Sequence, residues 1–119
     1  RDFTYVDDVV KSISLLIDNP PLIDDHYDKS SVDPATSWAP FRVLNIGNSD
    51  PSKLMDYIEA LESSLGSTAV KNFLPMQPGD VQHTSADCTR LFEITKFKPA
   101  TPISEGVSRF VQWYKEYYL

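Results

Sequence analysis

The chain has 119 residues, of which 41% are hydrophobic and 24% are charged. That length allows one domain at most, and a domain of this size removes a smaller share of its surface from water than a larger protein does. Acidic residues outnumber basic ones by 17 to 11, giving a formal net charge of −6. This balance argues against nucleic acid as a partner, because phosphate binding needs a basic face, but it leaves room for a local basic pocket around one diphosphate.

Several other classes are disfavoured by simple counts. No apolar run approaches the roughly 18 residues that a membrane-spanning helix needs. Cys88 is the only cysteine, so an internal disulfide is impossible and a reducing, cytoplasmic compartment is expected. Two histidines and one cysteine, widely spaced, predict no metal site. The chain does not open on Met and shows no signal-peptide pattern, so we expect a piece of a longer protein.

Four helices are predicted from hydrophobic spacing and from the residues at their ends. The first begins near Asp7, whose carboxylate can accept hydrogen bonds from free backbone N–H groups. The second begins after Ser52 and ends at Gly66, a residue suited to the left-handed turn beyond a helix. A short helix is expected at about 87–95, and the last opens at Pro102. The residues expected to face inward are Val10, Ile13, Leu16 and Ile17; Leu54, Ile58, Leu61 and Leu65; Leu91 and Ile94; and Ile103, Val107, Phe110, Tyr114 and Tyr117.

Between the helices the sequence predicts one long loop and a few short strands. Residues 19–41 form a Pro- and Asp-rich loop with four prolines, a length that is usually functional or disordered in a compact domain. Apolar runs at 43–46 and 70–75 predict two strands. The chain as a whole, 1–119, is therefore expected to be a small α+β domain with about four helices and a few short strands.

The residues that could carry chemistry are ordinary when they are taken one at a time. Arg1 beside Asp2 is most simply an exposed ion pair, which contributes little to stability. The run from Pro78 to Asp80 is most simply a surface turn. Neither feature alone predicts a function.

Taken in order along the chain, several short motifs resemble one family. They are Arg1 to Asp8, Val43 to Asn48, Pro78 to Val81, Ala86-Asp87, Phe97 to Thr101, and Glu105 to Val107. The series resembles the C-terminal third of nucleotide-sugar epimerases of the extended short-chain dehydrogenase/reductase family. The sequence of the segment from Asn72 to Val81 is most similar to that of UDP-glucuronate 4-epimerases.

The resemblance implies a parent with an α/β, Rossmann-like NAD-binding fold. The parent would be a homodimer that interconverts UDP-glucuronate and UDP-galacturonate. The family uses a Tyr-x-x-x-Lys pair and a Gly-rich turn, and this chain has neither: no Lys stands four places after Tyr57 or Tyr114, and Gly47 and Gly66 are too far apart. We therefore expect no catalytic residue and no NAD site here. Both would lie in a missing N-terminal Rossmann domain, and the isolated chain would be inactive.

The resemblance also assigns three substrate-binding residues. Arg1 matches the arginine that contacts the nucleotide diphosphate, and a planar guanidinium can hold two phosphate oxygens at once. Asp80 matches the acidic residue that accepts hydrogen bonds from the ribose hydroxyls of a UDP-sugar. Gln77 occupies a position where many UDP-galactose epimerases carry a second phosphate-binding arginine. Lys96 stands where family members commonly have Gly, so we expect that turn to differ locally.

Two alternatives stay open at this point. The parent could be another nucleotide-sugar epimerase, a 4,6-dehydratase or a decarboxylase, because the residue that changes the chemistry would lie outside this chain. The chain could instead be a non-enzymatic α+β interaction module that docks a partner through exposed apolar surface.

Overall fold

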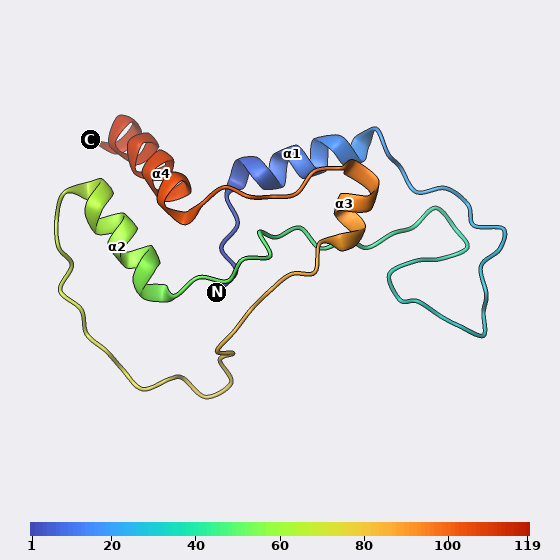
Figure 1. Ribbon diagram of the computed structural model, residues 1–119, viewed down its shortest axis with the longest axis horizontal. Helices are drawn as coiled ribbons and strands as arrows, with labels where there is room; N and C mark the ends of the chain where they lie inside the picture. The colour runs from blue at the N-terminus through green and yellow to red at the C-terminus, as the bar shows by residue number, and fades with distance from the viewer.

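The computed structural model describes all of residues 1–119 and contains four α-helices, which confirms the predicted number. They are α1 (Val6–Ile17), α2 (Leu54–Leu65), α3 (Thr89–Thr95) and α4 (Ile103–Tyr118). Long irregular segments join them, and Figure 1 shows residues 19–41 and the segment after α2 looping away from the helices. None of the four helices combines the length and the apolar character needed to cross a membrane.

The helix ends show where sequence rules hold and where they fail. Gly66 closes α2 in the left-handed conformation, with φ of 73°, and its N–H donates to the Glu62 carbonyl at 2.9 Å. Lys96 closes α3 in the same conformation, with φ of 54°. The expectation that a non-Gly residue would change this turn is therefore wrong. The hydrogen bond from the Lys96 N–H to the Phe92 carbonyl, at 2.8 Å, fixes the turn despite the side chain.

The predicted strands at 43–46 and 70–75 do not form, and this part of the fold prediction is wrong for the chain as it stands. The only sheet-like pairing is an isolated antiparallel bridge between Thr36 and Arg42. A strand needs a neighbour to accept and donate its backbone hydrogen bonds. The 43–46 run makes one such bond, from the Val43 N–H to the Ala35 carbonyl at 2.9 Å, and the ladder does not continue beyond it. In the 70–75 run, Val70 and Phe73 are largely exposed. Local hydrophobicity alone could not reveal that the neighbours are missing.

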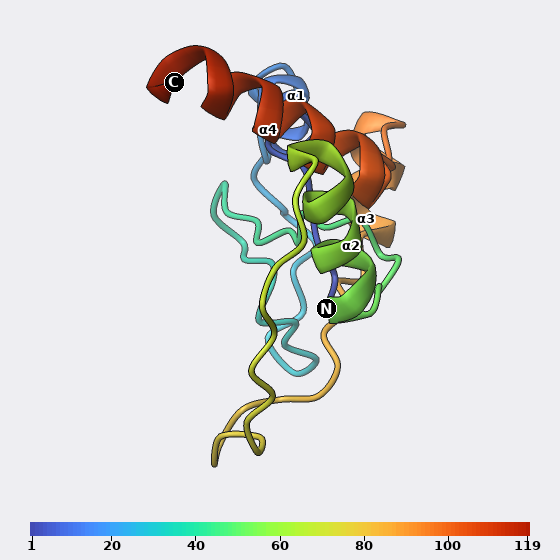
Figure 2. The same cartoon turned by 90° about the vertical axis from the view of Figure 1, so that its left-hand side faces the viewer.

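The helices pack as two pairs, α2 with α4 and α1 with α3. Figure 1 shows α4 beside α2 and α3 beneath the end of α1, and Figure 2 shows α4 crossing over one end of α2. The small core lies on α3 and α4, where Leu91, Val107 and Val111 are buried. Gly106 on α4 lets the ring of Tyr5 approach closely, because a Cβ there would lie 3.0 Å from the ring. The extended N-terminal segment is thereby held against α4.

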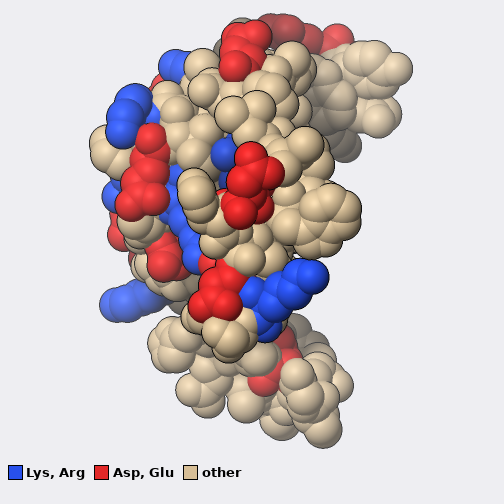
Figure 3. Space-filling model, turned by 90° about the vertical axis from the view of Figure 1, so that its right-hand side faces the viewer, with Lys and Arg blue, Asp and Glu red and all other residues tan.

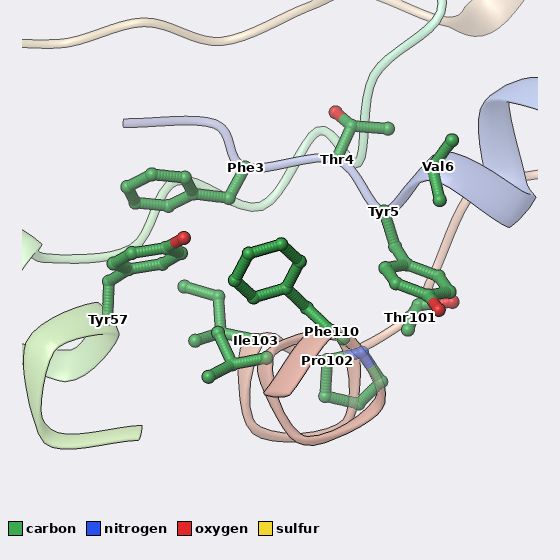
Figure 4. Close-up of a pocket in the computed structure, with 11 residues that line it drawn as sticks. Phe3, Thr4, Tyr5, Val6, Tyr57, Thr101, Pro102, Ile103 and Phe110 are labelled. Carbon is green, nitrogen blue, oxygen red and sulfur yellow. The ribbon is translucent and has the colours of Figure 1, made fainter. Parts of the chain in front are cut away.

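Aromatic side chains line a cavity of about 260 Å³ between the N-terminal segment, α2 and α4. The ring of Phe3 stacks on that of Tyr57 with 4.6 Å between centroids. Figure 4 shows this stack on one side, Phe110 and Ile103 in the middle, and Tyr5 above Pro102 on the other side. The side chains around the cavity come from elements that are distant in sequence, and their packing holds residues 1–5 beside the start of α2.

Charged side chains of both signs are interspersed over the face of the molecule in Figure 3. Ion pairs also link separate segments. Arg90 on α3 binds Asp33, which attaches the 19–41 loop to the body of the structure. Arg109 on α4 binds Glu105 on its own helix and approaches Asp7 of α1 at 3.4 Å. These pairs are exposed, so each contributes little to stability.

The chain leaves an unusual amount of its surface uncovered. Its accessible surface is 9001 Å², whereas a folded monomer of this mass exposes about 6,500 Å². Its radius of gyration is 18.8 Å, against about 13–14 Å for a compact domain of this length. Val10, Ile13 and Ile17 on α1 are 50–73% exposed, so their predicted inward orientation is wrong in the chain by itself. An amphipathic helix presents such a face when another body is meant to cover it.

Candidate functional site

Arg1 lies beside the start of α2. Its backbone carbonyl accepts a hydrogen bond from the Ser52 N–H at 2.9 Å, and its backbone nitrogen donates to the Ser52 carbonyl at 2.8 Å. Two bonds between one pair of residues fix both the distance and the relative orientation of their segments. The Arg1 side chain is therefore anchored at its base, although residue 52 is far away in sequence.

Asp2 connects the same segment to two loops. Its Oδ2 atom accepts hydrogen bonds from the Ser49 N–H at 3.1 Å and the Ala86 N–H at 2.9 Å. Its own N–H donates to Thr84 Oγ1 at 2.9 Å. Its second oxygen, Oδ1, is buried without a partner. Gly47 is needed nearby, because a Cβ there would lie 2.5 Å from the Ala86 Cβ.

Asp80 faces Arg1 from a tight turn in the segment between α2 and α3. The Asp80 N–H donates to the Gln77 carbonyl at 3.2 Å, and Gly79 has φ of 86°, which glycine adopts without strain. The Arg1 guanidinium forms an ion pair with Oδ1 of Asp80. The hydrogen bond from Arg1, followed by its charge, lowers the pKa of Asp80 below the ordinary aspartate value.

The two residues that the resemblance assigned to a UDP-sugar therefore lie on one face of the molecule and touch. Their side chains are 34% and 51% exposed. An ion pair this accessible is worth little as a structural contact, because water screens it. A ligand can reach both groups from solvent.

Arg1 and Asp80 both line a cavity of about 540 Å³, a size within the range of small-molecule sites. Gln77 is not among its lining residues; its carbonyl builds the turn instead. Sequence analysis did not single out the other polar residues of the cavity. They are Ser52, Lys53, Gln82 and His83.

The only signal in the sequence that could have identified these four residues as part of the site is their position next to residues already assigned to it. Ser52 and Lys53 stand at the start of α2, and Gln82 and His83 follow the Pro-Gly-Asp turn. No spacing rule connects the two pairs, since they meet only through the tertiary fold. No group of three or more His, Cys, Asp or Glu residues is placed to hold a metal ion.

The residues present do not fit an NAD site. A dinucleotide site needs a Gly-rich turn between a strand and a helix, so that the backbone can approach the pyrophosphate. Gly47 has no such space, because Ala86 and Asp2 pack against it. Gly66 closes the C-terminal end of α2, where a helix repels anions rather than binding them.

The fold of the chain is similar to part of one class of enzyme of known structure. The chain superposes on part of a nucleotide-sugar epimerase, UDP-glucuronic acid 4-epimerase from Bacillus cereus, whose crystal structure is a complex with UDP-glucuronic acid and NAD. The TM-score is 0.70, with 27% identity, over 99% of this chain and 32% of that one. No protein-family model matches the chain.

The sequence relatives include an enzyme with the same activity in its name. A probable UDP-glucuronate 4-epimerase from Rhizobium meliloti is 44% identical over 119 residues, which cover 99% of this chain and 35% of the relative. An uncharacterized 37.6 kDa protein of the cld 5′ region of Escherichia coli O111:H- is 52% identical over 118 residues, with the same two coverages. The resemblance to UDP-glucuronate 4-epimerases is thereby confirmed.

The chain spans about a third of the length of these relatives. The activity, substrate and partners of a whole epimerase are consequently matters of proposal for this chain. The coverage does not place the matching third at either end of the relatives, so its C-terminal position stays a prediction.

Proposed function

We propose that this chain is the UDP-sugar-binding portion of an NAD-dependent UDP-glucuronate 4-epimerase. The observation that carries the proposal is the meeting of Arg1 and Asp80, 79 positions apart in sequence, at the rim of one open cavity. A guanidinium suits a diphosphate, and a carboxylate suits ribose hydroxyls. The relatives support the choice of substrate, because they include UDP-glucuronate 4-epimerases from Rhizobium meliloti and Arabidopsis thaliana.

In this proposal the chain binds the nucleotide part of the substrate, while the epimerisation takes place in the part of the parent protein that lies outside this chain. NAD would take and return a hydride at the sugar, and it would be held by the part of the parent that lies outside this chain. Arg1 would orient the diphosphate, and Asp80 would fix the ribose. Gln77 would contribute through the turn that its carbonyl closes. Such positioning contributes to catalysis by holding the sugar at a fixed distance from the cofactor.

The uncovered surface supports the view that the chain acts within a larger protein. The apolar face of α1 and the excess accessible area are what a segment exposes when the body it packs against is removed. A cytoplasmic, homodimeric parent remains a prediction that rests on the resemblance alone.

Two measurements test the proposal. The full-length protein should convert UDP-glucuronate to UDP-galacturonate, whereas the 119-residue chain with added NAD should not; turnover by the chain alone would refute its assignment as a binding portion. In a titration with UDP, backbone amide signals near Arg1, Gln77 and Asp80 should shift. An unresponsive spectrum would favour the interaction module instead.

A matched pair of variants makes the test specific. Arg1→Lys keeps the charge but loses the two-oxygen geometry, and a lost charged hydrogen bond predicts about tenfold weaker UDP binding by the full-length protein. Arg90→Lys is the control, because Arg90 also forms an exposed pair with an aspartate, Asp33, outside the cavity. Equal losses in both variants would contradict the assignment of Arg1.

A further inference from the structure

A second positively charged residue, Lys53, lines the cavity at Arg1 and Asp80. Lys53 immediately precedes α2 and follows Ser52, the residue paired with the backbone of Arg1. The two cationic residues therefore extend from neighbouring backbone segments that two hydrogen bonds hold in register. No motif in the sequence connects them.

The charged side chain of Lys53 forms no ion pair in the structure. None of the five ion pairs involves Lys53. The carboxylate nearest along its helix, Asp56, accepts a hydrogen bond from the Lys53 backbone N–H at 3.2 Å rather than binding the ammonium. Lys71, by contrast, is bound to Glu62. A lysine that lines a cavity and has no ion-pair partner is available to a ligand.

The charges lining the cavity have the opposite balance to the whole chain. Among the lining residues, Arg1 and Lys53 contribute two positive charges and Asp80 contributes one negative charge. The chain as a whole carries −6. Such a local reversal of sign attracts an anion to this one place.

Gln77 cannot supply a second charge. It is neutral and does not line the cavity. A diphosphate in a nucleotide sugar carries about two negative charges, and Arg1 is already shared with Asp80. A second cation would balance the remaining charge, and Lys53 is the other Lys or Arg residue that lines the cavity.

We propose that Lys53 is a ligand-binding residue that acts with Arg1 on the diphosphate of a nucleoside diphosphate or its sugar derivative. The proposal deepens the proposed function and rests on it. Arg1 fixes the orientation of the diphosphate through its planar fork, and Lys53 neutralises the second phosphate as a point charge.

The test compares UDP with uridine, which lacks the phosphates, as ligands of the full-length protein. Lys53→Ala should weaken UDP binding about tenfold, the loss typical of one charged hydrogen bond, and should leave uridine binding unchanged. Lys53→Arg should restore most of the affinity for UDP. Lys29→Ala is the control, since it removes the same charge at a residue of the 19–41 loop that does not line the cavity.

Each outcome decides the question. UDP binding by Lys53→Ala within twofold of the unaltered protein would overturn the role of Lys53 while leaving the proposed function intact. Equal weakening for UDP and uridine, without rescue by Lys53→Arg, would show a structural effect and would also overturn it. If the unaltered protein binds no UDP, the proposed function fails first, and the inference fails with it.

Discussion

Replacing Asp2 by Ala should release the two loops that shape the cavity. The carboxylate oxygen Oδ2 accepts hydrogen bonds from the Ser49 and Ala86 N–H groups at 3.1 and 2.9 Å. Each hydrogen bond to a charged group is worth about 1.5 kcal/mol or more, so removing both should cost roughly 3 kcal/mol locally. Ser49 also has a left-handed backbone conformation, with φ of 57°, which is unfavourable for a residue other than Gly. The hydrogen bond to Asp2 helps to hold this conformation, so its loss adds to the cost.

Amide hydrogen exchange in the full-length protein measures this cost at the affected residues. A local loss of about 3 kcal/mol corresponds to roughly 100-fold faster exchange at the amides of Ser49 and Ala86. Asp2→Asn keeps an oxygen acceptor but not its charge, so it should lose less protection than Asp2→Ala. Asp7→Ala is the control, because Asp7 has only one long contact, to Arg109 at 3.4 Å. Equal protection in Asp2→Ala and Asp7→Ala would refute the role of Asp2 in holding the loops.

Two further predictions concern helix ends. Lys96→Gly should raise the free energy of unfolding of the full-length protein by about 0.5–1 kcal/mol, since a left-handed conformation costs a non-Gly residue about 1 kcal/mol. Lys98→Gly is the control, because Lys98 has no positive φ, and it should not stabilise the protein. Urea unfolding measures both variants, and a loss of stability in both would contradict this account. The hydrogen bond from Lys71 lowers the pKa of Glu62 below its ordinary 4.5, so the stability from this pair is present above pH 4.5 and is lost as pH falls through the lowered pKa. The Ala69 amide, bonded to the Glu62 carboxylate at 2.8 Å, should report that transition by NMR, and a midpoint at the ordinary pKa would contradict it.

The sequence by itself determined the helices and the resemblance to one family of enzymes. Helix hydrogen bonds join residues four apart, so periodic leucines and a closing Gly66 were enough to locate α2 within one or two residues. The order of short motifs identified the resemblance to UDP-glucuronate 4-epimerases, because it depends on residue identity rather than on contacts. It also singled out Arg1 and Asp80 before their meeting was visible.

Only the tertiary structure decided which residues share the site. The meeting of Arg1 with Asp80 depends on a loop that closes over 79 positions, and Lys53 enters the cavity because Ser52 pairs with Arg1. Such contacts follow from long-range packing, which leaves no periodic signal in the sequence. The failed strands at 43–46 and 70–75 and the exposed face of α1 have the same cause. Strand pairing and burial both require a partner surface, and a hydrophobic pattern does not say whether this chain supplies it.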